Sequence, residues 1–259
     1  MKKIIFFSTS LVFVCILLSC EAFSKPVYSF SRDISGVVGS MSTEELAGNI
    51  DKLAADPDKA TDIINELSSR NQEEVKNLPQ KDKEKLLDAG VGAILPTSKI
   101  GETVEQLTTG DGAKDYKKIM ETLASDSPDI NTKAMETVLQ DKDVLATTDA
   151  STLALGAASL IVNTVNNEGS DVNMENFQTA ATAASQNGSF NEDTFKQELE
   201  KQGFSQESIS TLTTAMGVTS VLTGTAGEGE PNRKEDLGAI QFGGMNMGDF
   251  LDQMTGVKK

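Results

Sequence analysis

The chain has 259 residues, with 39 acidic and 23 basic side chains, which gives a formal net charge of -16 at pH 7. It has no histidine and two cysteines, which excludes a Ser-His-Asp triad, a Cys-His pair, a His-ligated metal and a four-thiolate metal site. The acidic excess argues against nucleic-acid binding and against electrostatic docking to an anionic membrane, because both depend on lysine and arginine.

The N-terminus has the features of a secretory signal peptide. Lys2 and Lys3 form a positive start, and residues 4–18 form an uncharged, mostly apolar run. This run is shorter than the roughly 20 residues that an ordinary transmembrane helix needs, and it has the length of the apolar part of a signal peptide. We therefore expect residues 1–19 to be removed from the mature protein.

The apolar run ends in Leu17-Leu18-Ser19-Cys20, which resembles the lipobox of bacterial lipoproteins. The bulky Leu18 resembles the looser form of this motif in spirochaetes. The resemblance implies cleavage between Ser19 and Cys20 and transfer of a diacylglycerol to the Cys20 thiol. Acyl chains such as palmitate would then hold the protein in the outer membrane or on the periplasmic face of the inner membrane. The resemblance covers about the first 20 residues and says nothing of the body.

A second interpretation is an ordinary periplasmic or secreted protein. Ala22-Phe23-Ser24 is a small-x-small sequence, and a signal peptidase that cut after Ser24 would remove Cys20. Cysteine usage favours the first interpretation. Cys15 lies in the signal and Cys20 would be acylated, so the body would have no free thiol, which suits an oxidising envelope.

The body is predicted to be all-α. Residues 20–40 contain Pro26 and several serines without a helical period, and we expect a lipidated tether there. Ser42 and Glu45 form a capping box, and Pro57 begins a second helix. From Ser42 to residue 223, apolar residues recur at helical spacing. The stripes lie at 46–53, 60–67, 86–95, 116–123, 134–139, 153–165, 177–184, 195–199 and 209–222. These stripes predict a compact multi-helix bundle over residues 41–223.

A weak internal repeat runs through this bundle. Residues 53–58 resemble residues 123–129, and each segment is followed by an amphipathic stretch and then by a helix rich in small apolar residues. Those last helices contain residues 88–95 and 155–161, and residues 214–221 form a third version. The pattern predicts two or three degenerate helical repeats of roughly 60–70 residues. Since small residues let backbones approach closely, the three small-residue helices are expected to cross at the centre of one core.

Two further segments follow the bundle. Residues 224–236 are rich in glycine and glutamate and are expected to form a linker. Residues 237–259 are expected to form a C-terminal amphipathic helix, with apolar residues at i, i+3, i+4 and i+7. Those residues are Met247, Phe250, Leu251 and Met254. Such a face either packs back on the body or docks a partner, because methionine-rich faces are adaptable.

No catalytic residue, metal ligand or cofactor is assigned from the sequence. Acidic pairs such as Glu73-Glu74 are expected at helix starts, where they complement the helix dipole. The acidic segments 111–115 and 167–175 lack the order of ligands that an EF-hand requires. The residues near Gly227 follow no strand and carry acids that would repel a phosphate.

These observations favour a lipid-anchored bacterial envelope protein with a non-catalytic binding or structural role. Its expected partners are the membrane, through the N-terminal acyl chains, and an unidentified protein of the envelope or of a host. One alternative is a carrier of an apolar, lipid-like ligand in a cavity between the helices around Gly90, Gly156 and Gly217. Direct engagement of a bilayer by the helices is less favourable, because their polar sides are acidic.

Overall fold

The computed structural model describes residues 38–54, 57–95, 129–168, 172–185, 189–227, 229–238, 241–242, 245–246, 248 and 251. By its internal contacts the chain divides into Met1–Asp33 and Ile34–Lys259. All the described residues belong to the second unit. The signal peptide, the lipobox-like sequence and nearly all of the expected tether therefore lie outside the described residues.

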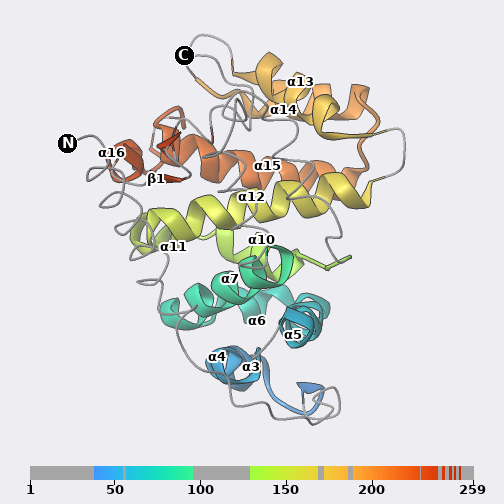
Figure 1. The fold of residues 1–259 in the computed structure, drawn as a ribbon, viewed down its shortest axis with the longest axis vertical. Helices are drawn as coiled ribbons and strands as arrows, with labels where there is room; N and C mark the ends of the chain where they lie inside the picture. The colour runs from blue at the N-terminus through green and yellow to red at the C-terminus, as the bar shows by residue number, and fades with distance from the viewer. Residues whose placement is uncertain are drawn as a thin grey trace, which may run out of the picture. The chain divides into compact units, whose positions relative to one another are not determined.

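The described residues confirm the predicted all-α bundle (Figure 1). In the first half of the chain the helices are α3 (Thr43–Gly48), α4 (Ile50–Leu53), α5 (Pro57–Ser69), α6 (Gln72–Lys76) and α7 (Gln80–Ile94). They continue as α10 (Lys133–Leu139), α11 (Lys142–Thr147), α12 (Ala150–Asn167), α13 (Met174–Ala184), α14 (Glu192–Lys201), α15 (Gln206–Thr223) and α16 (Lys234–Gly238). Two short strands, β1 (Gln241–Phe242) and β2 (Met245–Asn246), pair antiparallel, with Gln241 opposite Asn246.

Local capping signals place several helix starts. The Ser42 hydroxyl accepts from the Glu45 backbone N–H at 3.1 Å, and the Glu45 carboxylate accepts from the Ser42 N–H at 3.0 Å, which confirms the capping box. The side chains of Asp141, Asp149 and Ser205 accept the same kind of bond at the starts of α11, α12 and α15. These bonds satisfy backbone donors that the first turn of a helix leaves unpaired.

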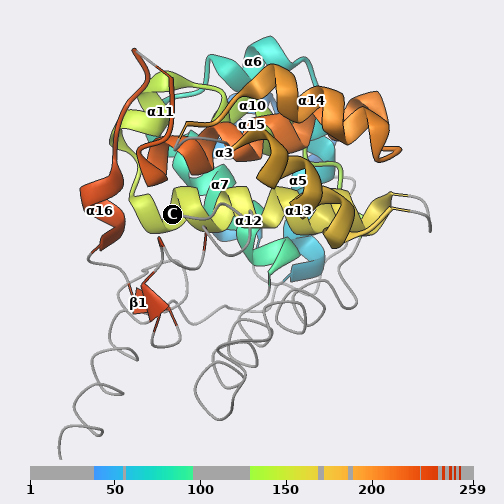
Figure 2. The ribbon, with the colours of Figure 1, turned by 90° about the horizontal axis from the view of Figure 1, so that it is seen from above.

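The centre of the bundle is α12, which packs against α15 on one side and α7 on the other (Figures 1 and 2). Every residue from 156 to 165 in α12 is buried. Most of these residues are apolar, as expected of a helix buried on all sides, because such a helix needs no polar face. The three small-residue helices predicted to meet in the core are α7, α12 and α15. Helix α12 contacts both of the others and lies between them.

The three long helices have a similar local context. A short helix and a tight turn precede each, as α6 precedes α7, α11 precedes α12 and α14 precedes α15. The sequence repeat itself stays a prediction, because residues 123–128 lie outside the described residues.

The glycines of these helices have three different environments. A Cβ atom added at Gly90 would lie 2.3 Å from Sδ of Met135, whereas one at Gly156 would meet Leu139 Cδ1 at an ordinary 3.6 Å. At Gly217 it would meet no atom within 4 Å. The similar patterns at the three sites thus correspond to a tight contact, an ordinary contact and an open surface.

The C-terminal region differs from the prediction. The last residues of the expected linker at 224–236 begin α16, and β1 and β2 occupy residues 241–242 and 245–246, in the first part of the expected helix at 237–259. Further along that expected helix, the described residues 248 and 251 are helical. Two glycines stand between these strands in the sequence, and glycine weakens a helix and favours a tight turn. In the described part of the chain, none of the helices is both long enough and apolar enough to cross a membrane.

Candidate functional site: a groove along α15

A surface groove of about 810 Å³ runs along α15 and is the candidate binding site. Its floor is one face of α15, with Ile209, Thr213, Gly217 and Val221 spaced four residues apart. We call this feature the α15 groove. The walls come from other elements. Leu139, Gln140, Lys142 and Leu145 of α10 and α11 line it, as do Phe190, Glu192 and Lys196 at α14, and Ala226, Gly227 and Glu230 beyond α15.

The groove exists because α15 is packed on only part of its circumference. Its most extensive packing is against α12, while α10 and α14 also touch it (Figure 2). None of the described helices covers the strip that contains Gly217, and a Cβ added there would meet no atom within 4 Å. Gly217 and Thr213 are small, so they leave the floor low between the two walls.

The charged side chains that line the groove are paired with one another. Lys142 Nζ lies 2.7 Å from Glu230 Oε1, and Lys196 Nζ lies 2.5 Å from Glu192 Oε1. Each pair is partly exposed and contributes little to stability. The pairs do determine the charge of the groove. Each lysine that lines it is balanced by one acid, so these four side chains carry no net charge, although the chain as a whole has a formal net charge of -16.

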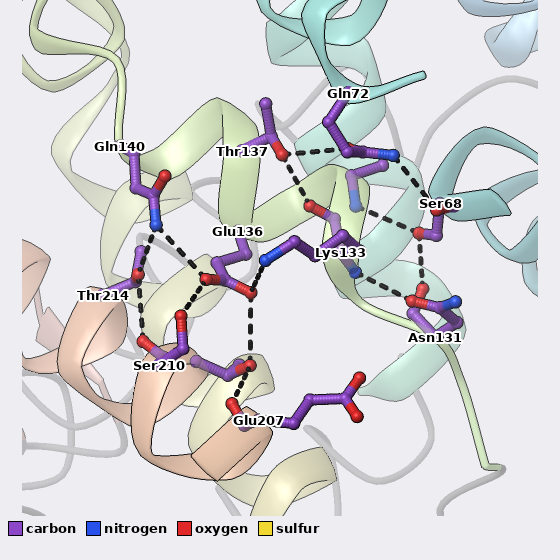
Figure 3. Close-up of polar contacts among 12 residues, drawn as sticks. Ser68, Gln72, Asn131, Lys133, Glu136, Thr137, Gln140, Glu207, Ser210 and Thr214 are labelled. Carbon is purple, nitrogen blue, oxygen red and sulfur yellow. Dashed lines mark hydrogen bonds and ion pairs between the residues drawn. The ribbon is translucent and has the colours of Figure 1, made fainter. Parts of the chain in front are cut away.

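A buried carboxylate at Glu136 lies beside the groove (Figure 3). Its Oε1 accepts from the Ser210 hydroxyl at 2.7 Å and from the Gln140 amide at 3.2 Å. Its Oε2 accepts from Lys133 Nζ at 3.1 Å and from the Thr211 hydroxyl at 3.3 Å. Four donors satisfy the acceptor capacity of a carboxylate, so this group is engaged in joining α10 to α15. Ser210 of α15 and Gln140 at the end of α10 also line the groove. Glu136 therefore links the floor of the groove to one of its walls.

The same polar contacts continue from α10 to the first helices. The Thr137 hydroxyl donates to the Gln72 side-chain oxygen at 2.9 Å, and the Ser68 hydroxyl donates to the Asn131 carbonyl at 2.6 Å (Figure 3). The Ser68 hydroxyl in turn accepts from the Ala134 N–H at 3.0 Å. Helix α10, which supplies one wall of the groove, is therefore held by hydrogen bonds on two sides.

A second unusual carboxyl, Asp88, lies away from the groove where α7 meets the start of α12. Burial raises the pKa of Asp88 to about 6, the Thr152 hydroxyl at 3.3 Å opposes this, and the nearby charges of Glu84 and Asp149 raise the pKa further. A perturbed carboxyl indicates a functional site only when partners for chemistry surround it. Here its named neighbours are two further acids and a hydroxyl, and we interpret it as an acid stabilised in its neutral form by the fold.

We predict that Asp88→Asn stabilises the protein at neutral pH. Because the folded pKa lies above the ordinary 3.8, the contribution of Asp88 to stability is present below pH 3.8 and is lost as the pH rises through about 6. The variant should gain about 2 kcal/mol in free energy of unfolding at pH 7.5 and much less at pH 4. Urea unfolding at both pH values measures this, with Asp62→Asn as an exposed control. An equal gain at both pH values would contradict the assignment.

The residues singled out from the sequence are only partly described. Ser19, Cys20, Met247, Phe250 and Met254 lie outside the described residues. Leu251 is fully buried in the hydrophobic core, which is the arrangement expected if this segment packs back on the body. Among the described residues, no three histidine, cysteine, aspartate or glutamate side chains come together as a metal site.

Sequence reasoning did not find the α15 groove. The sequence predicts that the small residues at 214–221 pack in the core or, in the alternative of a ligand carrier, line a cavity between helices, whereas the walls of the groove come from segments far away in the chain. A comparison of the chain with protein-family models, with curated proteins and with solved structures finds no match. The assignment of a function therefore depends on the sequence and geometry of the chain itself.

Proposed function

We propose that this chain is a lipid-anchored protein of the bacterial cell envelope whose helical body has a non-catalytic binding role, with the α15 groove as its binding surface. The anchor is supported by Leu17-Leu18-Ser19-Cys20, which resembles a lipobox. Acylation at Cys20 would supply two or more chains, and each buried CH₂ group contributes about 0.8 kcal/mol to membrane attachment. The observation that carries the binding role is the strip of α15 that lies between two walls and that no described helix covers.

The partner that fits this groove is a helical segment of another envelope or host protein. From Ile209 to Val221 the floor spans about three turns of helix, roughly 18 Å. The small residues Thr213 and Gly217 allow the backbone of a partner helix to approach closely. The balanced charges on the walls present no net repulsion, unlike the acidic surface of the chain as a whole.

We predict that Gly217→Leu abolishes partner binding and leaves the fold intact, because a Cβ added there would meet no atom within 4 Å and the side chain would take up space in the groove. Gly92→Leu is the matched control, since Gly92 is also a helical glycine with no atom within 4 Å of an added Cβ, but on α7. Chemical crosslinking in the envelope of producing cells, followed by quantitative mass spectrometry, should recover one partner at least about tenfold less with Gly217→Leu. Equal recovery with both variants would contradict the groove as the binding surface.

The anchor is tested separately by the intact mass of the mature protein from the membrane fraction. We expect a chain that begins at Cys20 and carries diacylglycerol. A chain that begins at Lys25 without lipid would establish the periplasmic or secreted interpretation instead. The alternative of an apolar-ligand carrier has less support, because Met135 and Leu139 side chains fill the space beside Gly90 and Gly156.

A further inference from the structure

Arg70 ties the first described residues of the chain to α5. Its Nη1 donates to the Met41 carbonyl oxygen at 2.6 Å, and its Nη2 donates to the Val38 carbonyl oxygen at 3.0 Å. Arg70 directly follows the last residue of α5, Ser69. Glu66, in the last turn of α5, accepts from Nε and Nη2 at 3.0 and 2.9 Å and fixes the direction of the guanidinium. Only arginine has the planar set of donors that can bridge a carboxylate and two carbonyl groups in this way.

The segment that Arg70 holds is also anchored by burial. Val38 is 3% exposed and belongs to the hydrophobic core, and the Arg70 side chain itself is 14% exposed. Hydrogen bonds to a charged donor are stronger when they are shielded from water. Without Arg70, the backbone contact that remains between the two held residues is the bond from the Met41 N–H to the Val38 carbonyl at 3.3 Å.

We propose that Arg70 is the positioning residue that ends the tether and transfers a pull on the N-terminus into α5. This inference rests on the proposed anchor at Cys20, because the N-terminus bears a load only if it is attached. Residues 21–37 lie between Cys20 and the clamp, and fully extended they could span about 60 Å. A pull along this segment reaches the Val38 and Met41 carbonyl groups first. The guanidinium holds both, so the load passes to α5 before it can unravel α3.

Hydrogen exchange of the unlipidated chain 20–259 tests the clamp itself. With Arg70→Met, the amides of residues 41–47 should exchange at least about tenfold faster, because two charge-assisted bonds to this segment are lost. Amides of α12 and α15 should be unchanged, which shows that the body remains folded. Arg70→Lys should resemble Arg70→Met, because an ammonium group cannot form the same fork.

Arg233 offers a matched control. Its guanidinium also donates to two backbone carbonyl groups, those of Leu145 and Thr148, and to the Asp236 carboxylate at 2.7 Å. Arg233→Met removes the same kind of fork at another place in the bundle. It should therefore leave exchange at residues 41–47 unchanged. Faster exchange there in this variant, or unchanged exchange in Arg70→Met, would overturn the clamp.

A pulling experiment tests the transfer of load. Cys20 is the single thiol of residues 20–259, so one handle can be attached there and the other at the C-terminus. The Arg70→Met chain should show an added step at low force, as α3 and α4 are released before the rest, and the unsubstituted chain should not. No added step would overturn the proposal. A native protein without lipid would overturn the anchor, and with it the load on Arg70, even if both experiments on the isolated chain gave the expected results.

Discussion

Asp141→Ala is expected to lower the free energy of unfolding by about 3–5 kcal/mol. Asp141 Oδ2 lies 2.5 Å from Nζ of Lys83, whose side chain is 8% exposed, so the variant leaves a buried ammonium group without a counter-charge. It also removes the side chain that caps the start of α11. Asp141→Asn separates the two effects, because asparagine caps a helix as well as aspartate but carries no charge. Urea unfolding of both variants at pH 7 measures each contribution.

The pH dependence of this effect has a defined sign. Burial raises the pKa of Asp141, but the hydrogen bonds from Lys83 and from the backbone N–H groups of Asp143 and Val144 outweigh it, and the net pKa lies below the ordinary 3.8. The stabilisation by the charged carboxylate is therefore present above pH 3.8 and is lost as the pH falls through the folded pKa. The difference between the unsubstituted chain and Asp141→Asn should shrink as the pH is lowered from 7 to 3. A difference that does not change with pH would show that the ion pair contributes nothing.

Gly90→Ala is expected to destabilise the protein by about 2–3 kcal/mol, whereas Gly156→Ala should stabilise it by up to about 1 kcal/mol. At Gly90 the new Cβ would lie 2.3 Å from Sδ and 2.9 Å from Cγ of Met135, which is fully buried and has little room to move. At Gly156 the nearest atom is at an ordinary contact distance, so the better helix propensity of alanine prevails. Thermal and urea unfolding of the two variants give the comparison directly.

A double-mutant cycle identifies the cause at Gly90. Met135→Ala alone should cost about 2–5 kcal/mol, because it leaves a cavity in the core. In the double variant the alanine at position 90 partly fills that cavity and no longer clashes. The double variant should therefore lose at least about 1 kcal/mol less free energy of unfolding than the sum of the two single losses. Simple additivity would mean that Met135 is not the group that resists a side chain at this position.

Local signals made several helix starts predictable, because a cap or a proline acts on its own first turn. Ser42 with Glu45 caps α3, which begins at the next residue, Thr43. Pro57 is itself the first residue of α5. The short helix α11 was not predicted, since six residues show too little of a helical period. At the C-terminus, the methionine and phenylalanine spacing begins after β2, and the described residues there, 248 and 251, are helical, so the error concerns only where the helix begins.

Features that depend on distant segments could not be predicted. The glycine patterns around 90, 156 and 217 show that a close approach is possible, but the group that fills the space, such as Met135, comes from elsewhere in the chain. The raised pKa of Asp88 depends partly on Asp149, which belongs to another helix. The α15 groove is formed by walls from α10, α11 and α14, and no single stretch of sequence contains its shape.

The position of α12 determines when the chain can finish folding. Residues 156–165 have no exposed face, so this helix is satisfied only when α7 and α15 cover it from both sides. Helix α15 ends at Thr223, and a ribosome makes it after most of the chain has already emerged. The core therefore closes late in synthesis, because α12 lacks one of the two helices that bury it until α15 has been made.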